Sequence, residues 1–160
     1  MTIKAGDPLP AATFMTMTAN GPEPVDSASF FKGKKVALFS VPGAFTPTCS
    51  AKHLPGFIEK ADALKAKGVD EIACTAVNDV FVMSAWAKNA GAEGKVTMLA
   101  DGNGDFAKAL GLTMDGSKFG MGTRGQRFSM IVEDGVVTTL NVEAPGEFKV
   151  SAADHMLGQL

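Results

Sequence analysis

One apolar run near residue 40 limits the possible folds more than any other segment of the chain. Residues Val36 to Val41 are nearly all apolar, follow Lys34-Lys35 and stop at Pro42-Gly43. A central strand that is covered on both faces has this pattern, because neither of its sides meets water. From Cys49 to Lys67, apolar residues recur at three- and four-residue steps, which indicates a helix with one apolar face. A strand followed by such a helix is typical of an α/β sheet.

This alternation of strand and helix patterns continues along the chain. Pro55 lies inside the first helical segment, where we expect it to kink the helix or divide it from the turn before. Asp134-Gly135 between two β-rich runs indicates a hairpin, which adds an antiparallel edge to otherwise parallel strands. We therefore expect a single α/β domain, residues 1–160, with a central mixed sheet of about five strands flanked by helices. The expected elements are an extended arm or hairpin within residues 1–30, a helical turn at 25–33, strands at 36–41, 71–77, 96–100, 128–133 and 136–142, and helices at 49–67, 81–89, 105–110 and 151–160.

The composition argues against several classes of function. The chain has 160 residues, of which 46% are hydrophobic and 20% charged, as in globular domains. A formal net charge of −2 provides no electrostatic footprint for nucleic acid or for an anionic membrane. No apolar run approaches the ~20 residues of a membrane span, and the N-terminal residues lack the apolar core of a signal peptide. We therefore expect a cytoplasmic protein with neither nucleic acid nor membrane as a partner.

The two cysteines, Cys49 and Cys74, and the two histidines, His53 and His155, do not have the spacing of a zinc site or of a CxxC motif. We expect no metal ion and no disulfide scaffold. Cys74 lies on an apolar predicted strand, which favours a buried core position. His53 follows Cys49 by one helical turn and could tune a thiolate there, but we interpret it as a polar surface residue.

The segment between the first predicted strand and its helix carries the chemistry. Cys49 lies in the first turn of the helix, where unpaired N–H groups and the helix dipole favour a thiolate. The Thr46 hydroxyl can donate to the sulfur or to a bound oxygen, and can accept from a substrate O–H. Pro42 and Pro47 stiffen the loop and remove backbone donors near the sulfur. A lone cysteine after a strand is commonly a small core residue, but this surrounding pattern favours a reactive one.

The sequence Pro-Gly-Ala-Phe-Thr-Pro-Thr-Cys-Ser at residues 42–50 resembles the active-site motif of the peroxiredoxins, and most closely that of their atypical type II, peroxiredoxin 5-like branch. The resemblance implies a thioredoxin-like fold and a thiol-dependent peroxidase that needs no metal or organic cofactor. Such an enzyme reduces hydrogen peroxide and alkyl hydroperoxides, in antioxidant defence and cell redox homeostasis. Further segments resemble the branch in order and spacing, at residues 53–57, 65–69, 77–79, 99–101 and 127–130.

The resemblance also implies a role for each residue of the motif. Cys49 matches the peroxidatic cysteine, Thr46 the threonine that hydrogen-bonds the peroxide, and Pro42 the proline that shields the sulfur. Arg127 matches the arginine that holds the thiolate and polarises the peroxide. An arginine suits this role because it stays charged and offers several donors from one planar group, which can follow charge as it moves. Arg124 could support the site or bind an anionic reductant.

Two routes remain open for reducing the sulfenic acid that forms on the peroxidatic cysteine. Cys74 matches the second cysteine of plant type II members and could form an intramolecular disulfide. That bond requires Cα atoms within about 7 Å, so the first helical turn would have to unwind. The favoured route is attack by glutathione, with glutaredoxin or thioredoxin completing the cycle. The resemblance further implies a homodimer, with residues 44–45, 81–82 and 114–119 as contact segments.

Other functions are compatible with the same residues. In a redox sensor or relay, oxidised Cys49 passes its oxidation to a partner protein. In a non-catalytic binding module on the same fold, Cys49 has no chemical role. A thiol–disulfide oxidoreductase is disfavoured because the chain has no CxxC motif.

Overall fold

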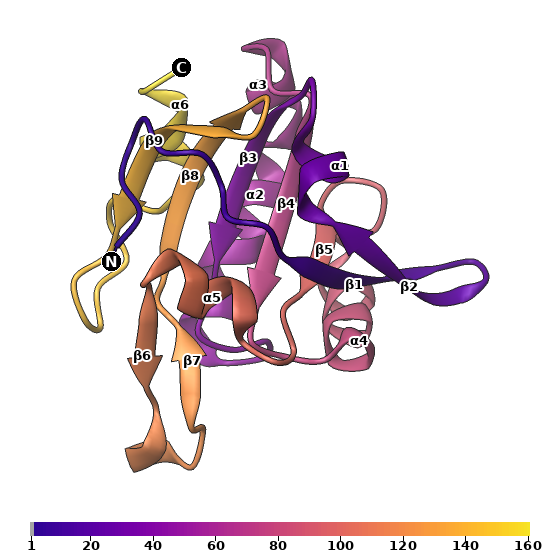
Figure 1. The fold of residues 1–160 in the computed structure, drawn as a ribbon, viewed down its shortest axis with the longest axis vertical. Coiled ribbons are helices and arrows are strands. Elements are labelled where there is room, and N and C mark those ends of the chain that lie inside the picture. Colours follow the sequence, from indigo (N-terminus) through magenta and orange to yellow (C-terminus); the bar gives the residue numbers. More distant parts are fainter. Residues whose placement is uncertain (1) are drawn as a thin grey trace.

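A seven-stranded mixed sheet forms the centre of the molecule within residues 2–160, which the computed structural model describes (Figure 1). The strand order is β2-β1-β5-β4-β3-β8-β9. The three central strands β3, β4 and β5 run parallel, and the remaining neighbours pair antiparallel. The strands are β1 (Thr13–Thr18), β2 (Gly21–Asp26), β3 (Lys35–Ser40), β4 (Glu71–Ala76), β5 (Thr97–Ala100), β8 (Phe128–Glu133) and β9 (Val136–Val142).

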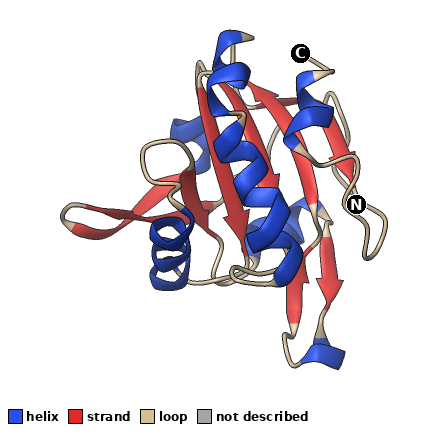
Figure 2. Ribbon diagram, turned by 180° about the vertical axis from the view of Figure 1, so that it is seen from behind, coloured by secondary structure: helices blue, strands red, loops and turns tan. Residues whose placement is uncertain are grey.

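Helices cover both faces of the sheet, as the alternating pattern predicts (Figure 2). On one face, side chains of β3 and β4 such as Phe39 and Ile72 pack against α2 (Leu54–Glu59), α3 (Ala61–Ala66), α4 (Val80–Ala90) and α6 (Ala153–Leu157). On the other face, the alternate side chains Leu38 and Ala73 pack against α1 (Ser27–Phe31) and α5 (Asp105–Leu110). Successive residues of a strand point to opposite faces, so each apolar strand contributes to two cores.

The sheet has more strands than the sequence predicts. The five predicted strands are present, and the Asp134-Gly135 hairpin joins β8 to β9 as expected. The two additional strands come from the N-terminal hairpin, which joins the sheet where Met15 pairs with Ala100. Pro22 and Pro24 lie on β2, the edge strand, where a missing backbone donor costs little. The estimate of about five strands is therefore too low, because the proline-rich arm is itself part of the sheet.

The helix predicted at residues 49–67 consists of three pieces. It begins as a π-helical turn, η1 (Cys49–His53), and continues as α2, which has Pro55 in its first turn. Proline is tolerated there because the N–H that it lacks has no partner in a first turn. Pro55 thus divides the helix from the turn before it, as predicted. A second break, at Lys60 before α3, has no signal in the sequence that we recognised.

A small hairpin that the sequence does not predict projects beyond the sheet (Figure 1). It consists of β6 (Thr113–Asp115), the 3-10 turn η2 (Ser117–Phe119) and β7 (Thr123–Gly125). The turn needs glycine at Gly116, because a Cβ there would lie 2.9 Å from Cβ of Met121 and 3.0 Å from the carbonyl oxygen of Gly122. Strands of three residues are too short for their period to be recognised in a sequence. Among residues 2–160, no helix has the length and apolar character needed to cross a membrane.

Candidate active site

Cys49 lies just beyond the carboxyl end of β3, at the position where open α/β sheets bind ligands. The chain leaves β3 at Ser40 and enters η1 at Cys49, whose side chain is fully buried. The connecting loop is anchored to the neighbouring loop after β4, because the N–H of Ala44 donates to the side-chain oxygen of Asn78 at 2.9 Å. The cysteine is therefore held at a fixed place at the edge of the sheet.

The loop before Cys49 folds back on itself through Thr46. The Thr46 hydroxyl donates to the carbonyl oxygen of Gly43 at 2.7 Å, and the Thr46 carbonyl accepts from the N–H of Ser50 at 2.9 Å. A Cβ on Gly43 would lie 3.1 Å from both Met121 and the Thr46 side chain, so only glycine fits without displacing them. Because a carbonyl can only accept, the hydroxyl proton of Thr46 is committed and its lone pairs remain free for a donor.

Arg127 reaches the Cys49 sulfur from the other side of β3. Arg127 directly precedes β8, and β8 pairs with β3 so that Phe128 lies opposite Ser40. This register places the arginine beside the strand end that leads to Cys49. Nη2 of Arg127 donates to Sγ of Cys49 at 3.0 Å. The guanidinium keeps its charge at any relevant pH, so a fixed positive charge contacts a buried sulfur, where electrostatic interactions are stronger than in water.

His53 is buried against this arginine, and its interpretation as a surface residue is wrong. Its Nδ1 lies 2.9 Å from Nη1 of Arg127, and its Nε2 lies 3.0 Å from the carbonyl oxygen of Ser151. The ring is packed among aromatic side chains, with centroid distances of 4.8 Å to Phe39 and 5.0 Å to Phe148. The signal was present in the sequence, because a residue one helical turn from a buried cysteine shares its face.

The surroundings of His53 keep its imidazole neutral. Burial lowers the pKa of His53 from 6.5 to about 3, and the positive charge of Arg127 adds to this effect. The hydrogen bonds require the same state, since a guanidinium can only donate and a carbonyl can only accept. The proton therefore lies on Nε2, and the Nδ1 lone pair faces Arg127.

Glu143 holds the segment whose carbonyl accepts the hydrogen bond from His53. Its Oε2 accepts from the N–H and the hydroxyl of Ser151, at 2.8 and 2.6 Å, and from the N–H of Lys149 at 2.7 Å. Burial opposes ionisation of the carboxyl, but these hydrogen bonds outweigh it and lower the pKa of Glu143. The backbone N–H of Glu143 also donates to the carbonyl of Arg127 at 3.0 Å. Sequence reasoning missed Glu143 and Ser151, which no motif singles out.

Arg124 and Cys74 do not take part in the hydrogen bonds around the sulfur. Arg124 donates to two backbone carbonyls, through Nε to Met121 at 2.8 Å and through Nη1 to Val77 at 3.0 Å, and so ties β7 to the loop after β4. Cys74 is buried on β4 opposite Phe39, as predicted, and both cysteines are free thiols. Burial raises the pKa of the Cys74 thiol well above its usual range, and the nearby Cys49 adds to this effect.

A cavity of about 690 Å³ opens beside the arginine. Pro42, Thr48 and Arg127 form the part of its wall next to Cys49. The rest comes from the projecting hairpin and from the loop after β9, including Met114, Phe119, Ala144 and Pro145. Cys49 itself is not part of this wall, but a small polar molecule in the cavity would meet Arg127, which contacts the Cys49 sulfur, and an apolar tail attached to it has carbon-rich walls to contact.

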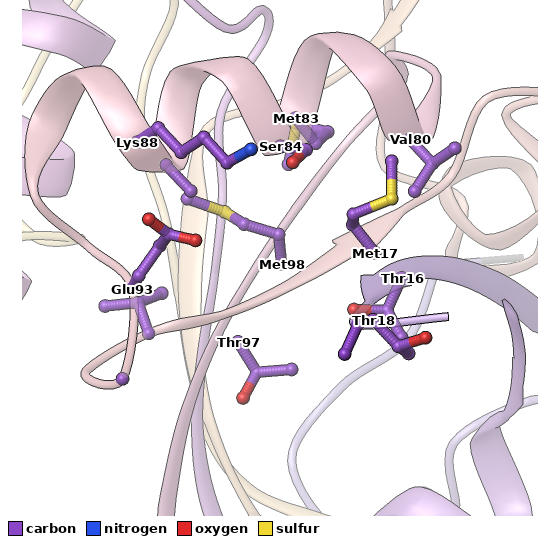
Figure 3. A pocket seen from close by; sticks show the side chains of 14 residues that line it. Thr16, Met17, Thr18, Val80, Met83, Ser84, Lys88, Glu93, Thr97 and Met98 are labelled. Carbon is purple, nitrogen blue, oxygen red and sulfur yellow. The ribbon is translucent and has the colours of Figure 1, made fainter. Parts of the chain in front are cut away.

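A second hollow, of about 470 Å³, lies between α4 and the strands β1 and β5 (Figure 3). Its wall includes the methionines Met17, Met83 and Met98 and the charged Lys88 and Glu93, and it includes none of the predicted site residues. Within the part of the chain that the structure describes, no three His, Cys, Asp or Glu side chains are grouped so that they could hold a metal ion. Of these two hollows, the one beside Arg127 is therefore the one that includes predicted site residues, namely Pro42 and Arg127.

Comparison with known proteins finds similarity along nearly the whole chain. Residues 4–157 match the family model described as Redoxin. Peroxiredoxin-2B of Arabidopsis thaliana is 50% identical over 159 residues, covering 99% of this chain and 98% of that protein. The crystal structure of reduced Prx3 in complex with H₂O₂ from Vibrio vulnificus superposes with a TM-score of 0.96 and 55% identity, covering 99% of each chain. Peroxiredoxin 5 from Alvinella pompejana superposes with a TM-score of 0.84 and 36% identity, covering 97% of this chain and 96% of that one.

The buried neutral His53 predicts a specific dependence of stability on pH. Unfolded His53 takes up a proton below its ordinary pKa of 6.5, whereas the folded side chain takes it up only near pH 3. The stabilisation is complete above pH 6.5 and is lost as the pH falls toward 3, with a slope approaching about 1.4 kcal/mol per pH unit. Urea unfolding between about pH 7 and 5, in a Cys49→Ser background that lacks the thiol, measures this slope. The same slope in the variant His53→Asn would contradict the assignment, and His155→Asn, at an exposed position in α6, serves as the matched control.

Proposed function

The chain belongs to the redoxin family as a type II peroxiredoxin, a thiol-dependent peroxidase, and on this premise we propose that Cys49 is its peroxidatic cysteine, assisted by Arg127, Thr46 and Pro42. The observation that carries the proposal is the 3.0 Å hydrogen bond from Nη2 of Arg127 to Sγ of Cys49. A guanidinium on a buried sulfur stabilises the thiolate, which is the nucleophilic form of cysteine. Pro42 lies on the cavity wall near the sulfur and contributes no N–H to it.

The reaction follows from the donors and acceptors at the site. The Cys49 sulfur attacks one peroxide oxygen, so that an S–O bond forms and the O–O bond breaks. The sulfur loses two electrons and becomes a sulfenic acid, and the departing oxygen takes the bonding pair and a proton from water and leaves as water or an alcohol. The Thr46 hydroxyl oxygen accepts a hydrogen bond from the peroxide O–H, because its own proton is donated to the Gly43 carbonyl. Arg127 stabilises the charge as it passes from the sulfur to the departing oxygen.

We propose hydrogen peroxide and alkyl hydroperoxides as substrates. The structure of the relative from Vibrio vulnificus contains hydrogen peroxide, which supports the same substrate here. The cavity beside Arg127 is lined by apolar side chains such as Met114, Phe119 and Pro145, which supports larger, alkyl-bearing hydroperoxides as well.

For the reductant we propose glutathione, with glutaredoxin or thioredoxin completing the cycle. The state of Cys74 supports an external thiol, because burial raises the pKa of its thiol well above the usual range. A protonated thiol is a poor nucleophile toward a sulfenic acid. Cys74 could act as a resolving cysteine only after a local rearrangement that exposed it.

We propose that residues 1–160 act as one domain and associate as a homodimer. Phe45, Phe81 and Phe119 are 50%, 64% and 77% exposed, and large apolar side chains left open in this way favour contact with a second chain. These three side chains lie in the contact segments predicted from the sequence. We assign the protein to the cytoplasm, which cell fractionation would check, since relatives such as the chloroplastic Peroxiredoxin-2E of Arabidopsis thaliana work elsewhere.

Variants of the motif residues test the proposed roles. Cys49→Ser should abolish consumption of hydrogen peroxide, because the serine hydroxyl is not ionised at neutral pH. Thr46→Val keeps the shape of the side chain but removes its oxygen, and should lower the second-order rate constant with peroxide by about tenfold or more. Thr46→Ser, which keeps the hydroxyl, should stay within about threefold of the parent. Undiminished turnover by Cys49→Ser in a coupled NADPH assay would rule out the proposed nucleophile.

The choice of reductant predicts that Cys74 is dispensable. Cys74→Ala should turn over peroxide with glutathione and glutaredoxin at a rate within about twofold of the parent, since its thiol has no step to perform. Peptide mass analysis of the parent, oxidised in the presence of glutathione, should find glutathione on Cys49. An internal Cys49–Cys74 disulfide in the parent, together with loss of turnover in Cys74→Ala, would assign the resolving step to Cys74 instead.

Light scattering tests the proposed dimer. The parent should have twice the mass of one chain at micromolar concentration, and Phe81→Asp should shift the population toward monomer by placing charge on the contact. Val136→Asp is the matched control, because Val136 is also exposed, at 39%, but lies on β9 away from the three phenylalanines. A monomeric parent, or equal effects of the two variants, would count against this interface.

A further inference from the structure

The hydrogen bonds around Arg127 close into a ring. Nη1 of Arg127 donates to Nδ1 of His53 at 2.9 Å, and Nε2 of His53 donates to the Ser151 carbonyl at 3.0 Å. The Ser151 hydroxyl donates to Oε2 of Glu143 at 2.6 Å, and the backbone N–H of Glu143 donates to the Arg127 carbonyl at 3.0 Å. The proposed reaction uses only the branch that leaves this ring, from Nη2 of Arg127 to Cys49.

This ring of hydrogen bonds fixes the plane of the guanidinium. Nη1 and Nη2 belong to one rigid planar group, so holding Nη1 on a fixed acceptor also determines where Nη2 points. The acceptor is a ring nitrogen of His53, which is buried and cannot swing toward solvent. The Phe148 ring lies near the guanidinium, at 5.9 Å from its carbon to the ring centroid. Together these contacts direct one N–H of Arg127 at the sulfur.

His53 itself does not reach the reacting atoms. Its two ring nitrogens are both occupied, one by Arg127 and the other by the Ser151 carbonyl. A role as proton donor or acceptor for the peroxide is therefore excluded by geometry. Any contribution that His53 makes to the reaction passes through Arg127.

We propose that His53 is a positioning residue for peroxide reduction, which holds the Arg127 guanidinium in the plane that places Nη2 on the Cys49 sulfur. The imidazole is in turn held by the Ser151 carbonyl, and Ser151 is held by Glu143. This inference rests on the proposed role of Arg127 and adds a residue to it. The low pKa of His53 agrees with this arrangement, because a protonated ring would have no lone pair to offer the guanidinium.

The ring of hydrogen bonds also connects the site to the wall of the cavity. Residues 143–147 of the loop after β9 line the cavity, and the same loop carries the carboxylate that holds Ser151. The segment that a substrate meets on entry is therefore fastened, through Ser151 and His53, to the arginine that acts on the peroxide.

Two amide substitutions of His53 separate its two hydrogen bonds. In His53→Asn, the amide oxygen can take the place of Nδ1 and accept from Arg127, while the bond to Ser151 is lost. In His53→Gln, the amide nitrogen can take the place of Nε2 and donate to Ser151, while the bond to Arg127 is lost. Both variants remove the imidazole, so they share most of the loss of packing.

The experiment compares two reactions of Cys49 in each variant. The first is oxidation by hydrogen peroxide, followed by stopped-flow fluorescence of Trp86, the single tryptophan, whose Nε1 donates to Oγ of Ser50 beside Cys49. The second is alkylation by iodoacetamide, which needs the thiolate but has no O–O bond to polarise. The ratio of the two rate constants measures the action of Arg127 on the peroxide.

We expect His53→Gln to lower this ratio by about tenfold or more, the size of effect that loss of one oriented donor has on a transition state. His53→Asn should stay within about threefold of the parent. Equal ratios in the two variants, or a parental ratio in His53→Gln, would overturn the inference. A purely structural role would lower the thermal stability of both variants and leave the ratio unchanged.

Two further measurements make the result unambiguous. Arg127→Gln should lower the same ratio at least as far as His53→Gln. If it does not, the proposed role of Arg127 fails, whereas a loss in Arg127→Gln without one in His53→Gln removes only the role of His53.

¹⁵N NMR of the imidazole in the unmodified protein requires no variant to fold. A proton on Nε2 and none on Nδ1 at pH 7 is the expected result, and a proton on Nδ1 would overturn the proposal.

Discussion

A guanidinium that is taken out of bulk water needs a partner for its charge and an acceptor for each N–H that faces the interior. Arg127 meets this requirement with the Cys49 sulfur on one terminal nitrogen and the His53 ring on the other. The remaining features of the site follow from these two contacts. The Cys49 sulfur accepts one N–H, and the neutral imidazole of His53 supplies a lone pair for another, since a second cation at that place would be repelled.

The fold brings these groups together through one register. The antiparallel pairing of β3 with β8 places Phe128 opposite Ser40, so the residue before β8 lies beside the loop that leaves β3. Cys49 follows that loop, and His53 follows Cys49 on the same face of the helix. The register of the sheet thus sets the distance between the sulfur and the guanidinium, and the apolar cores packed on both faces hold the strands in place.

Aromatic packing explains why the imidazole of His53 stays neutral at the centre of this arrangement. Phe39 stacks on Phe57 with a centroid distance of 4.1 Å, and the His53 ring lies against both of them and against Phe148. These side chains exclude water from the imidazole, which disfavours its protonated form. The same exclusion of water strengthens the hydrogen bonds that the ring makes.

Local patterns in the sequence were sufficient for most of the fold and for part of the site. Apolar runs such as residues 36–41 identified the strands, and the motif at residues 42–50 identified the loop that contains Cys49 and Thr46. An arm or hairpin was expected within residues 1–30, but its place in the sheet was not, because its prolines lie on an edge strand. The β6–β7 hairpin was not predicted, because its strands are short. The hydrogen bond between His53 and Ser151 joins residues separated by 98 positions, and such a contact depends on the packing of α6 and not on any local pattern.

Peroxide should oxidise the sulfur of Cys49, which Arg127 contacts. Intact-mass and peptide analysis of the reduced protein, mixed with one equivalent of hydrogen peroxide and quenched within seconds, tests this most directly. Peroxide could instead oxidise one of the nine methionines or the buried thiol of Cys74. We expect a gain of one oxygen on the peptide that contains Cys49, with the methionines and Cys74 unchanged. An unchanged mass, or oxygen found on methionine alone, would contradict it.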